Sequence, residues 1–102
     1  NIKKIKGPGQ LKFHYSPGIP VFMEQTLPRK NGAFISYGKK FRNNKNYFNL
    51  SKKSNLKEAA TNLYKTMRKI KKLKFKSIAV CKIPSIGIGI AINERLKKAS
   101  YK

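Results

Sequence analysis

The length, composition and charge of the chain bound what it can be. Its 102 residues are enough for one domain with a modest core. A hydrophobic content of 39%, with six Phe and five Tyr, excludes a disordered tail. The longest stretch of low charge, residues 83–92, is half of the roughly 20 residues that a membrane-spanning helix needs, so we expect no membrane segment.

The net charge of +22 has two explanations. Such a charge suits binding to phosphate backbones. However, the chain has 21 Lys against 4 Arg, with 11 Ile, 9 Asn and no Asp, which is the profile of an A/T-rich genome. Because nucleic-acid readers favour the planar fork of Arg, we expect a solvated surface with non-specific affinity for polyanions. Specific RNA recognition stays open as an alternative.

Features of the N-terminus and the lone cysteine lead us to expect a cytoplasmic protein. The N-terminus lacks the apolar core of a secretory signal, and Cys81 has no cysteine to pair with. Because Cys81 lies in an apolar stretch, we expect it to be a small core side chain. The chain opens on Asn1 rather than Met, so we expect further sequence to precede it.

The first predicted unit is an extended linker arm over residues 1–18, which contain three Gly and two Pro without a helical or strand period. An α/β domain is expected over residues 19–102. Its first part contains three short strand patterns, at residues 19–23, 33–37 and 47–50. The connector 24–32 is too short for a crossover helix, so the first two strands are expected to be antiparallel or loosely placed.

The second part of this domain has the stronger patterns. Apolar residues from Leu56 onward repeat with helical spacing and predict a helix over 56–72. Asn55 is the expected N-cap, and the carboxylate of Glu58 is expected to reach back to its amide. A buried strand over 77–83 and a helix over 87–100 follow; the apolar face of that helix is expected to comprise Ile88, Ala91, Ile92, Leu96 and Ala99. The order strand, helix, strand, helix predicts a layered α/β fold with a mostly parallel sheet of about four strands and two main helices.

The residue types exclude most catalytic constellations. Three Glu and no Asp make a carboxylate pair for acid–base chemistry improbable. His14 and Cys81 are the single residues of their kinds, and an apolar strand disfavours a thiolate. We therefore expect no catalytic residues and no metal site in this chain.

Two segments are candidate sites. Gly87 and Gly89 lie where a strand meets a helix, so free amides there could hold an anion, or the small residues could allow close packing. The turn-rich arm contains Pro8 and Gly9 and then presents His14 and Tyr15 outside any amphipathic element. Such side chains are either surface residues or ligands.

Taken in order, these segments resemble the C-terminal part of two-domain threonylcarbamoyl-AMP synthases. The matching stretches are residues 7–17 (GPGQLKFHYSP), 48–51 (FNLS) with 56–60 (LKEAA), and 87–99 (GIGIAINERLKKA). The resemblance implies a small Rossmann-like accessory domain that follows a YrdC-like catalytic domain. It departs from the family at Gly7, where Ser is common, and at the connector 24–32, where many members have a helix.

The resemblance also implies an activity for the parent enzyme. That enzyme combines ATP, bicarbonate and L-threonine into threonylcarbamoyl-AMP and pyrophosphate, for modification of a tRNA adenosine. Its magnesium and ATP would bind the catalytic half, so this segment would need no cofactor and would be inactive alone. Pro8, Gly9, His14 and Tyr15 would contact the nucleotide or close the cleft. A stand-alone basic protein that associates with RNA or the ribosome is the alternative.

Overall fold

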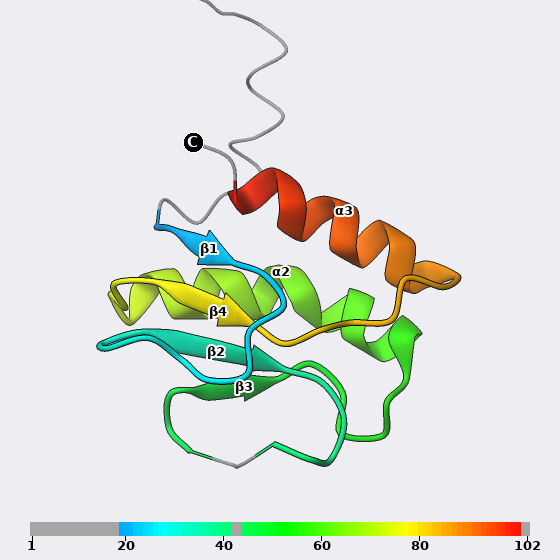
Figure 1. Ribbon diagram of the computed structural model, residues 1–102, viewed down its shortest axis with the longest axis horizontal. Helices are drawn as coiled ribbons and strands as arrows, with labels where there is room; N and C mark the ends of the chain where they lie inside the picture. Colours follow the sequence, from blue (N-terminus) through cyan, green and yellow to red (C-terminus); the bar gives the residue numbers. More distant parts are fainter. Residues whose placement is uncertain (1–18, 42–43, 101–102) are drawn as a thin grey trace, which may run out of the picture.

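The computed structural model describes residues 19–41 and 44–100. These residues form one four-stranded sheet with strand order β1-β4-β2-β3, in which every neighbouring pair is parallel. The strands are β1 (Val21–Phe22), β2 (Ala33–Ser36), β3 (Tyr47–Asn49) and β4 (Ile78–Val80), and the helices are α2 (Leu56–Lys72) and α3 (Ile88–Ser100). Figure 1 shows α2 behind the sheet and α3 beside β1. The predicted α/β class is confirmed.

The expectation for the first two strands was wrong. β1 and β2 do not pair with each other, because β4 lies between them and pairs in parallel with both. The connector therefore crosses the end of β4 without a helix, and the amide of Gln25 donates to the carbonyl of Val80 at 2.8 Å. A strand that follows much later in the chain decides this topology, so local patterns could not show it.

The two faces of the sheet are covered differently. Phe48 of β3 packs edge-on against Phe75, just after α2, with 5.9 Å between ring centroids. Phe34 of β2 points to the opposite face, where its ring lies 5.2 Å from that of Phe41 and 5.1 Å from that of Tyr47. Helices therefore cover one face, and the loops after β1 and β2 cover the other.

The predicted helix over 56–72 is confirmed, with one difference at its start. Asn55 caps it, since its Oδ1 accepts from the amide of Glu58 at 3.0 Å. The amide of Asn55 does not reach the Glu58 carboxylate but donates to Ser51 Oγ at 3.0 Å. Ser51 Oγ in turn donates to Glu58 Oε1 at 2.5 Å. Ser51 thus inserts between the two residues of the expected capping box.

The C-terminal elements also follow the sequence pattern, with shorter bounds. Cys81 and Ile83 stay buried after β4 has ended. In α3 the residues Ile92 and Leu96 are fully buried, whereas Ile88 is 43% exposed and was wrongly expected in the core. Within residues 19–41 and 44–100, no helix combines the length and the apolar character needed to cross a bilayer.

Candidate functional site

The carboxyl ends of the strands form the edge where the chain diverges. The connection after β2 leads to β3 on one side, while β4 leads to α3, which packs beside β1 on the other side. In open parallel sheets, ligands bind in the crevice outside the carboxyl ends of strands where connections diverge in this way. Two cavities lie at this edge, one on each side of the divergence.

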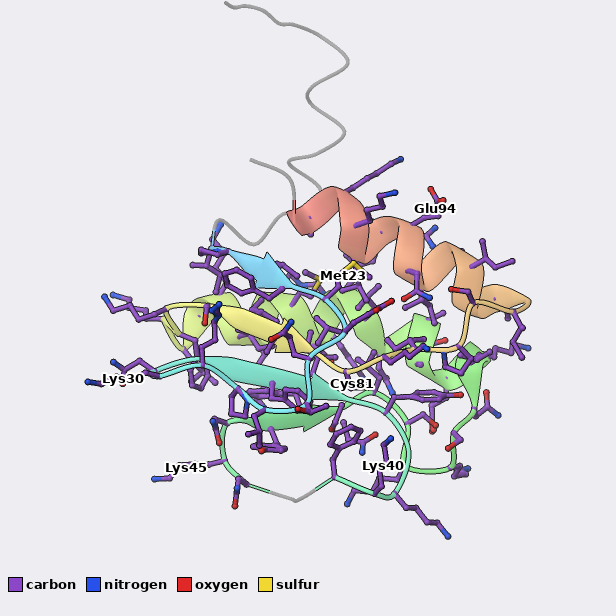
Figure 2. The ribbon with its side chains drawn as sticks, viewed as in Figure 1. Met23, Lys30, Lys40, Lys45, Cys81 and Glu94 are labelled. Atoms are coloured by element: carbon purple, nitrogen blue, oxygen red, sulfur yellow. The ribbon has the colours of Figure 1, made fainter. Side chains whose placement is uncertain are left out.

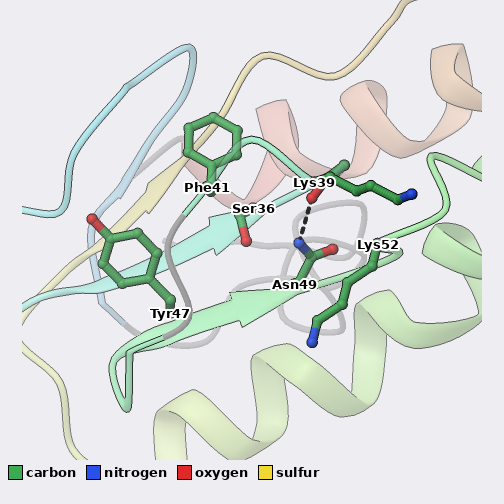
Figure 3. Close-up of a pocket in the computed structure, with 7 residues that line it drawn as sticks. Ser36, Lys39, Phe41, Tyr47, Asn49 and Lys52 are labelled. Atoms are coloured by element: carbon green, nitrogen blue, oxygen red, sulfur yellow. Dashed lines mark hydrogen bonds between the residues drawn. The ribbon is translucent and has the colours of Figure 1, made fainter.

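The first cavity, which we term the β2–β3 pocket, has a volume of ≈ 190 Å³. It is lined by Ser36, Gly38, Lys39, Phe41, Tyr47, Asn49 and Lys52 (Figure 3). Parallel register places Ser36 beside Asn49 and Phe34 beside Tyr47. The outward positions of two adjacent strands and the loops that follow them therefore form the walls.

Hydrogen bonds hold these walls in place. Asn49 Nδ2 donates to the carbonyl of Gly38 at 2.8 Å, and Asn49 Oδ1 accepts from the amide of Ser51 at 2.8 Å. The amide of Gly38 donates to the carbonyl of Ser51 at 2.9 Å. Gly38 has φ +91°, a conformation that residues with a Cβ rarely adopt. One side chain thus links both loops and leaves the pocket shape defined before any ligand binds.

Ser36 is the most unusual residue of the pocket. Its relative exposure is 0%, and its Oγ has no hydrogen-bond partner among the described residues. In Figure 3 the hydroxyl points toward the space between Tyr47 and Asn49. A buried hydroxyl without a partner costs about 1–3 kcal/mol, so such groups are uncommon and call for an explanation.

The charge of the pocket is entirely positive. Two of its seven lining residues are Lys39 and Lys52, and none is acidic. The aromatic side chains of Phe41 and Tyr47 form an apolar wall, and the ammonium group of Lys40 lies 5.3 Å from the centroid of the Phe41 ring. Positive charge beside a hydroxyl suits an anionic ligand.

The second cavity, the β1–β4 pocket, is larger, at ≈ 360 Å³. It is lined by Met23, Glu24, Cys81, Ile83, Ser85, Ile90, Asn93, Glu94 and Lys97. Figure 2 shows Met23 and Cys81 at the end of the sheet and Glu94 on α3. Two of the three Glu carboxylates of the chain, Glu24 and Glu94, line this pocket, and no sequence pattern predicted that they would meet. Among the described residues, no three His, Cys, Asp or Glu side chains group as a metal site would require.

Cys81 is not a nucleophile in this setting. Burial raises the pKa of its thiol to about 11, and the amide of Tyr37 and the charge of Lys40 only partly offset that effect. The side chain is 3% exposed. The prediction that Cys81 is a small core residue is confirmed.

The comparison with known families decides the identity of the chain. A family model described as threonylcarbamoyl-AMP synthase, C-terminal domain, matches residues 1–100. The chain belongs to this family. The resemblance inferred from the residues is thereby confirmed, and the family implies a partner catalytic domain. No curated protein and no solved structure matches the chain in the same comparisons.

The arm of this synthase C-terminal domain contains four of the candidate residues predicted from the sequence. Pro8, Gly9, His14 and Tyr15 lie outside the described residues, so their role stays a prediction.

The two glycines at the start of α3 differ from each other. A Cβ on Gly89 would overlap the carbonyl oxygen of Pro84, so close packing explains this residue. Gly87 has φ +51° and open space around it. The amide of Gly89 donates to the carbonyl of Ile86 at 2.8 Å, and the amide of Ile90 donates to that of Gly87 at 3.1 Å. An anion site on the remaining amides stays a prediction.

Sequence reasoning missed the β2–β3 pocket of the domain. The sequence feature that could have indicated this pocket is a polar residue at the end of each strand, Ser36 after Ala-Phe-Ile and Asn49 after Tyr-Phe. Once two strands are known to be parallel neighbours, such residues meet at one edge. The neighbour relation itself was the missing information.

Proposed function

We propose that this chain is the accessory C-terminal domain of an enzyme that makes threonylcarbamoyl-AMP and pyrophosphate from ATP, bicarbonate and L-threonine. The observation that supports the proposal is the family match, which spans residues 1–100. The product would serve tRNA modification in the cytoplasm, so tRNA would be an indirect partner of this domain.

The described residues support an accessory role rather than a catalytic one. Burial keeps the only thiol protonated at neutral pH. The lining of neither pocket offers a histidine, and the β2–β3 pocket lacks a carboxylate as well. The described residues do not fit a magnesium site either. We therefore assign magnesium and ATP to the YrdC-like catalytic half.

The arm supplies the mechanical part of the proposal. Residues 1–18 would cross the mouth of the catalytic cleft, with Pro8, Gly9, His14 and Tyr15 against the nucleotide. A closed cleft excludes water from a labile carboxylated intermediate and positions the reacting groups. In this proposal the described domain anchors the arm.

The test compares the isolated chain with the chain fused to a YrdC-like catalytic half, with pyrophosphate release as the readout. We expect no release from the isolated chain and turnover from the fusion.

Replacing His14→Ala and Tyr15→Ala together should lower kcat of the fusion at least about tenfold, because a loose lid misplaces the reactants. The control is Lys53→Gln, at an exposed residue of the domain. Turnover by the isolated chain, or an unchanged kcat in the double variant, would contradict the proposal.

The second candidate function, RNA association, is favoured by the net charge of +22. A purely electrostatic attraction should become very weak at about 0.2 M salt, because counterion release then favours binding far less than at low salt. A gel-shift titration with tRNA at this salt concentration distinguishes specific RNA recognition from non-specific electrostatic attraction. Retained binding that depends on RNA sequence or structure would support the RNA-associated function over the accessory one.

A further inference from the structure

We propose that the β2–β3 pocket binds a small phosphate-type oxyanion, with the hydroxyl of Ser36 donating to it and Lys39 and Lys52 neutralising its charge. The proposal goes beyond the accessory function above, and its evidence is independent of that function. It rests on the cavity, on one buried hydroxyl and on the charge of the lining residues.

The first argument is the hydroxyl of Ser36. This side chain is fully buried, has no hydrogen-bond partner among the described residues, and lines the cavity. A ligand oxygen in the cavity would give the hydroxyl its missing acceptor. Hydrogen bonds to charged acceptors stabilise a complex more than hydrogen bonds to neutral acceptors do. An oxyanion would therefore best offset the cost of burying the hydroxyl.

The second argument is the arrangement of the neighbouring polar groups. Both ends of the Asn49 amide are already used, one by Gly38 and the other by Ser51. They are therefore structural, and they hold the two loops in place around the cavity. Ser36 is left as the buried polar group that remains free to bind, and its neighbours need not rearrange.

The third argument is charge, which selects among small ligands. An amino acid carries an ammonium group as well as a carboxylate, and that group needs an acceptor or an acidic partner. The pocket lining offers two lysines and no acidic residue. An ammonium group would thus be repelled, whereas phosphate or pyrophosphate would be attracted at every oxygen.

The fourth argument is size. A volume of ≈ 190 Å³ equals about six times the roughly 30 Å³ that one water molecule occupies in the liquid. Phosphate and pyrophosphate fit this space, while a nucleoside triphosphate is too large to be enclosed in it. The ligand is therefore a compact oxyanion rather than a nucleotide.

The two lysines approach the pocket from one side. Figure 3 shows their stems on the Asn49 side of the pocket, with the ammonium group of Lys39 directed away from Tyr47 and that of Lys52 below Asn49. Both side chains are exposed. A four-carbon stem rotates freely at the surface, so each ammonium group can turn toward an anion at the rim. Ser36 would define the position of the ligand, and the lysines would add affinity.

The experiment is an NMR titration of the 102-residue chain with inorganic phosphate, pyrophosphate and L-threonine, each in a separate arm. An ionic strength of about 0.15 M screens weak attraction to the many surface lysines. We expect saturable shifts of the Ser36, Gly38 and Asn49 amide signals with phosphate or pyrophosphate, and the tighter arm identifies the ligand. L-threonine should bind at least about tenfold more weakly, because its ammonium group is repelled.

Matched variants distinguish binding in this pocket from non-specific attraction of the anion to the surface lysines. Ser36→Ala should weaken binding about tenfold, equal to one charged hydrogen bond. Its control is Ser77→Ala, because Ser77 is also a buried serine without a partner among the described residues but precedes β4, at the opposite edge of the sheet. Lys52→Gln should weaken binding severalfold, whereas Lys53→Gln, one residue away and not part of the lining, should not.

Three outcomes would overturn the proposal. They are shifts that spread evenly over lysine-rich segments without saturation, equal effects of Ser36→Ala and Ser77→Ala, and tighter binding of L-threonine than of either phosphate. Circular dichroism checks that each variant folds. If Ser36→Ala failed to fold, an equal affinity of the Lys52→Gln and Lys53→Gln variants would still contradict the proposal.

Discussion

Cys81 links the stability of the domain to alkaline pH. Burial raises the pKa of its thiol from 9.0 to about 11, so the unfolded chain loses this proton first as the pH rises. The contribution of the thiol to stability is complete below pH 9 and is lost as the pH rises toward 11. Between these limits the wild type should lose about 1–3 kcal/mol of unfolding free energy more than Cys81→Ala.

Urea unfolding of both proteins from pH 8 to 11 measures this difference. The lysines titrate in the same range, but they are common to the two proteins and cancel in the comparison. Parallel curves for the wild type and Cys81→Ala would show that the thiol does not couple to folding. The absolute stability of the variant does not matter here, because only the change of unfolding free energy with pH is compared.

Gly89 is the second residue for which the structure predicts a clear change in stability. In most helices, Gly→Ala increases stability by up to about 1 kcal/mol. Here the added Cβ would overlap the carbonyl oxygen of Pro84, so Gly89→Ala should destabilise the domain by about 1–3 kcal/mol. Thermal unfolding measures the change. Gly87→Ala is the control: it introduces strain at φ +51° but meets no atom within 4 Å, and it should cost less.

At the scale of elements, Ser51 joins β3 to α2. Its Oγ accepts from the amide of Asn55 and donates to the carboxylate of Glu58. Ser51→Ala removes both contacts from a buried site, so we expect a loss of about 1–3 kcal/mol. Asn55→Ala removes only the N-cap and should cost about 1 kcal/mol. Urea denaturation ranks the two variants, and a larger loss for Asn55→Ala than for Ser51→Ala would contradict the expectation.

Elements with their own periodicity were predictable from sequence, and pairings between distant elements were not. The face of α2 could be predicted because Leu63, Met67 and Ile70 repeat with helical spacing and all are buried. The position of β4 between β1 and β2 could not, since it depends on contacts between segments far apart in the chain. The same limit applies to the site. Ser36 and Asn49 were visible as polar residues, but only the register of β2 and β3 places them together.

At the scale of the whole molecule, charge is the dominant property. With 25 basic and 3 acidic residues, the folded chain concentrates a charge of +22 that the unfolded chain spreads over a larger volume. Self-repulsion therefore opposes folding. A bound oxyanion in the β2–β3 pocket would relieve part of this repulsion, because Lys39 and Lys52 both line this pocket. A catalytic domain or RNA with negative charge would relieve it over a larger surface.

This repulsion predicts that salt stabilises the domain. Raising NaCl from about 0.05 M to about 0.5 M shortens the screening length by roughly threefold, so Tm should increase by several degrees. The matched variant carries Gln at Lys53, Lys57 and Lys65, three exposed positions. It should be more stable than the wild type at low salt, and the difference should shrink at high salt. Scanning calorimetry at both concentrations measures this. If the advantage of the variant were equal at both, its origin would be helix propensity or packing rather than charge.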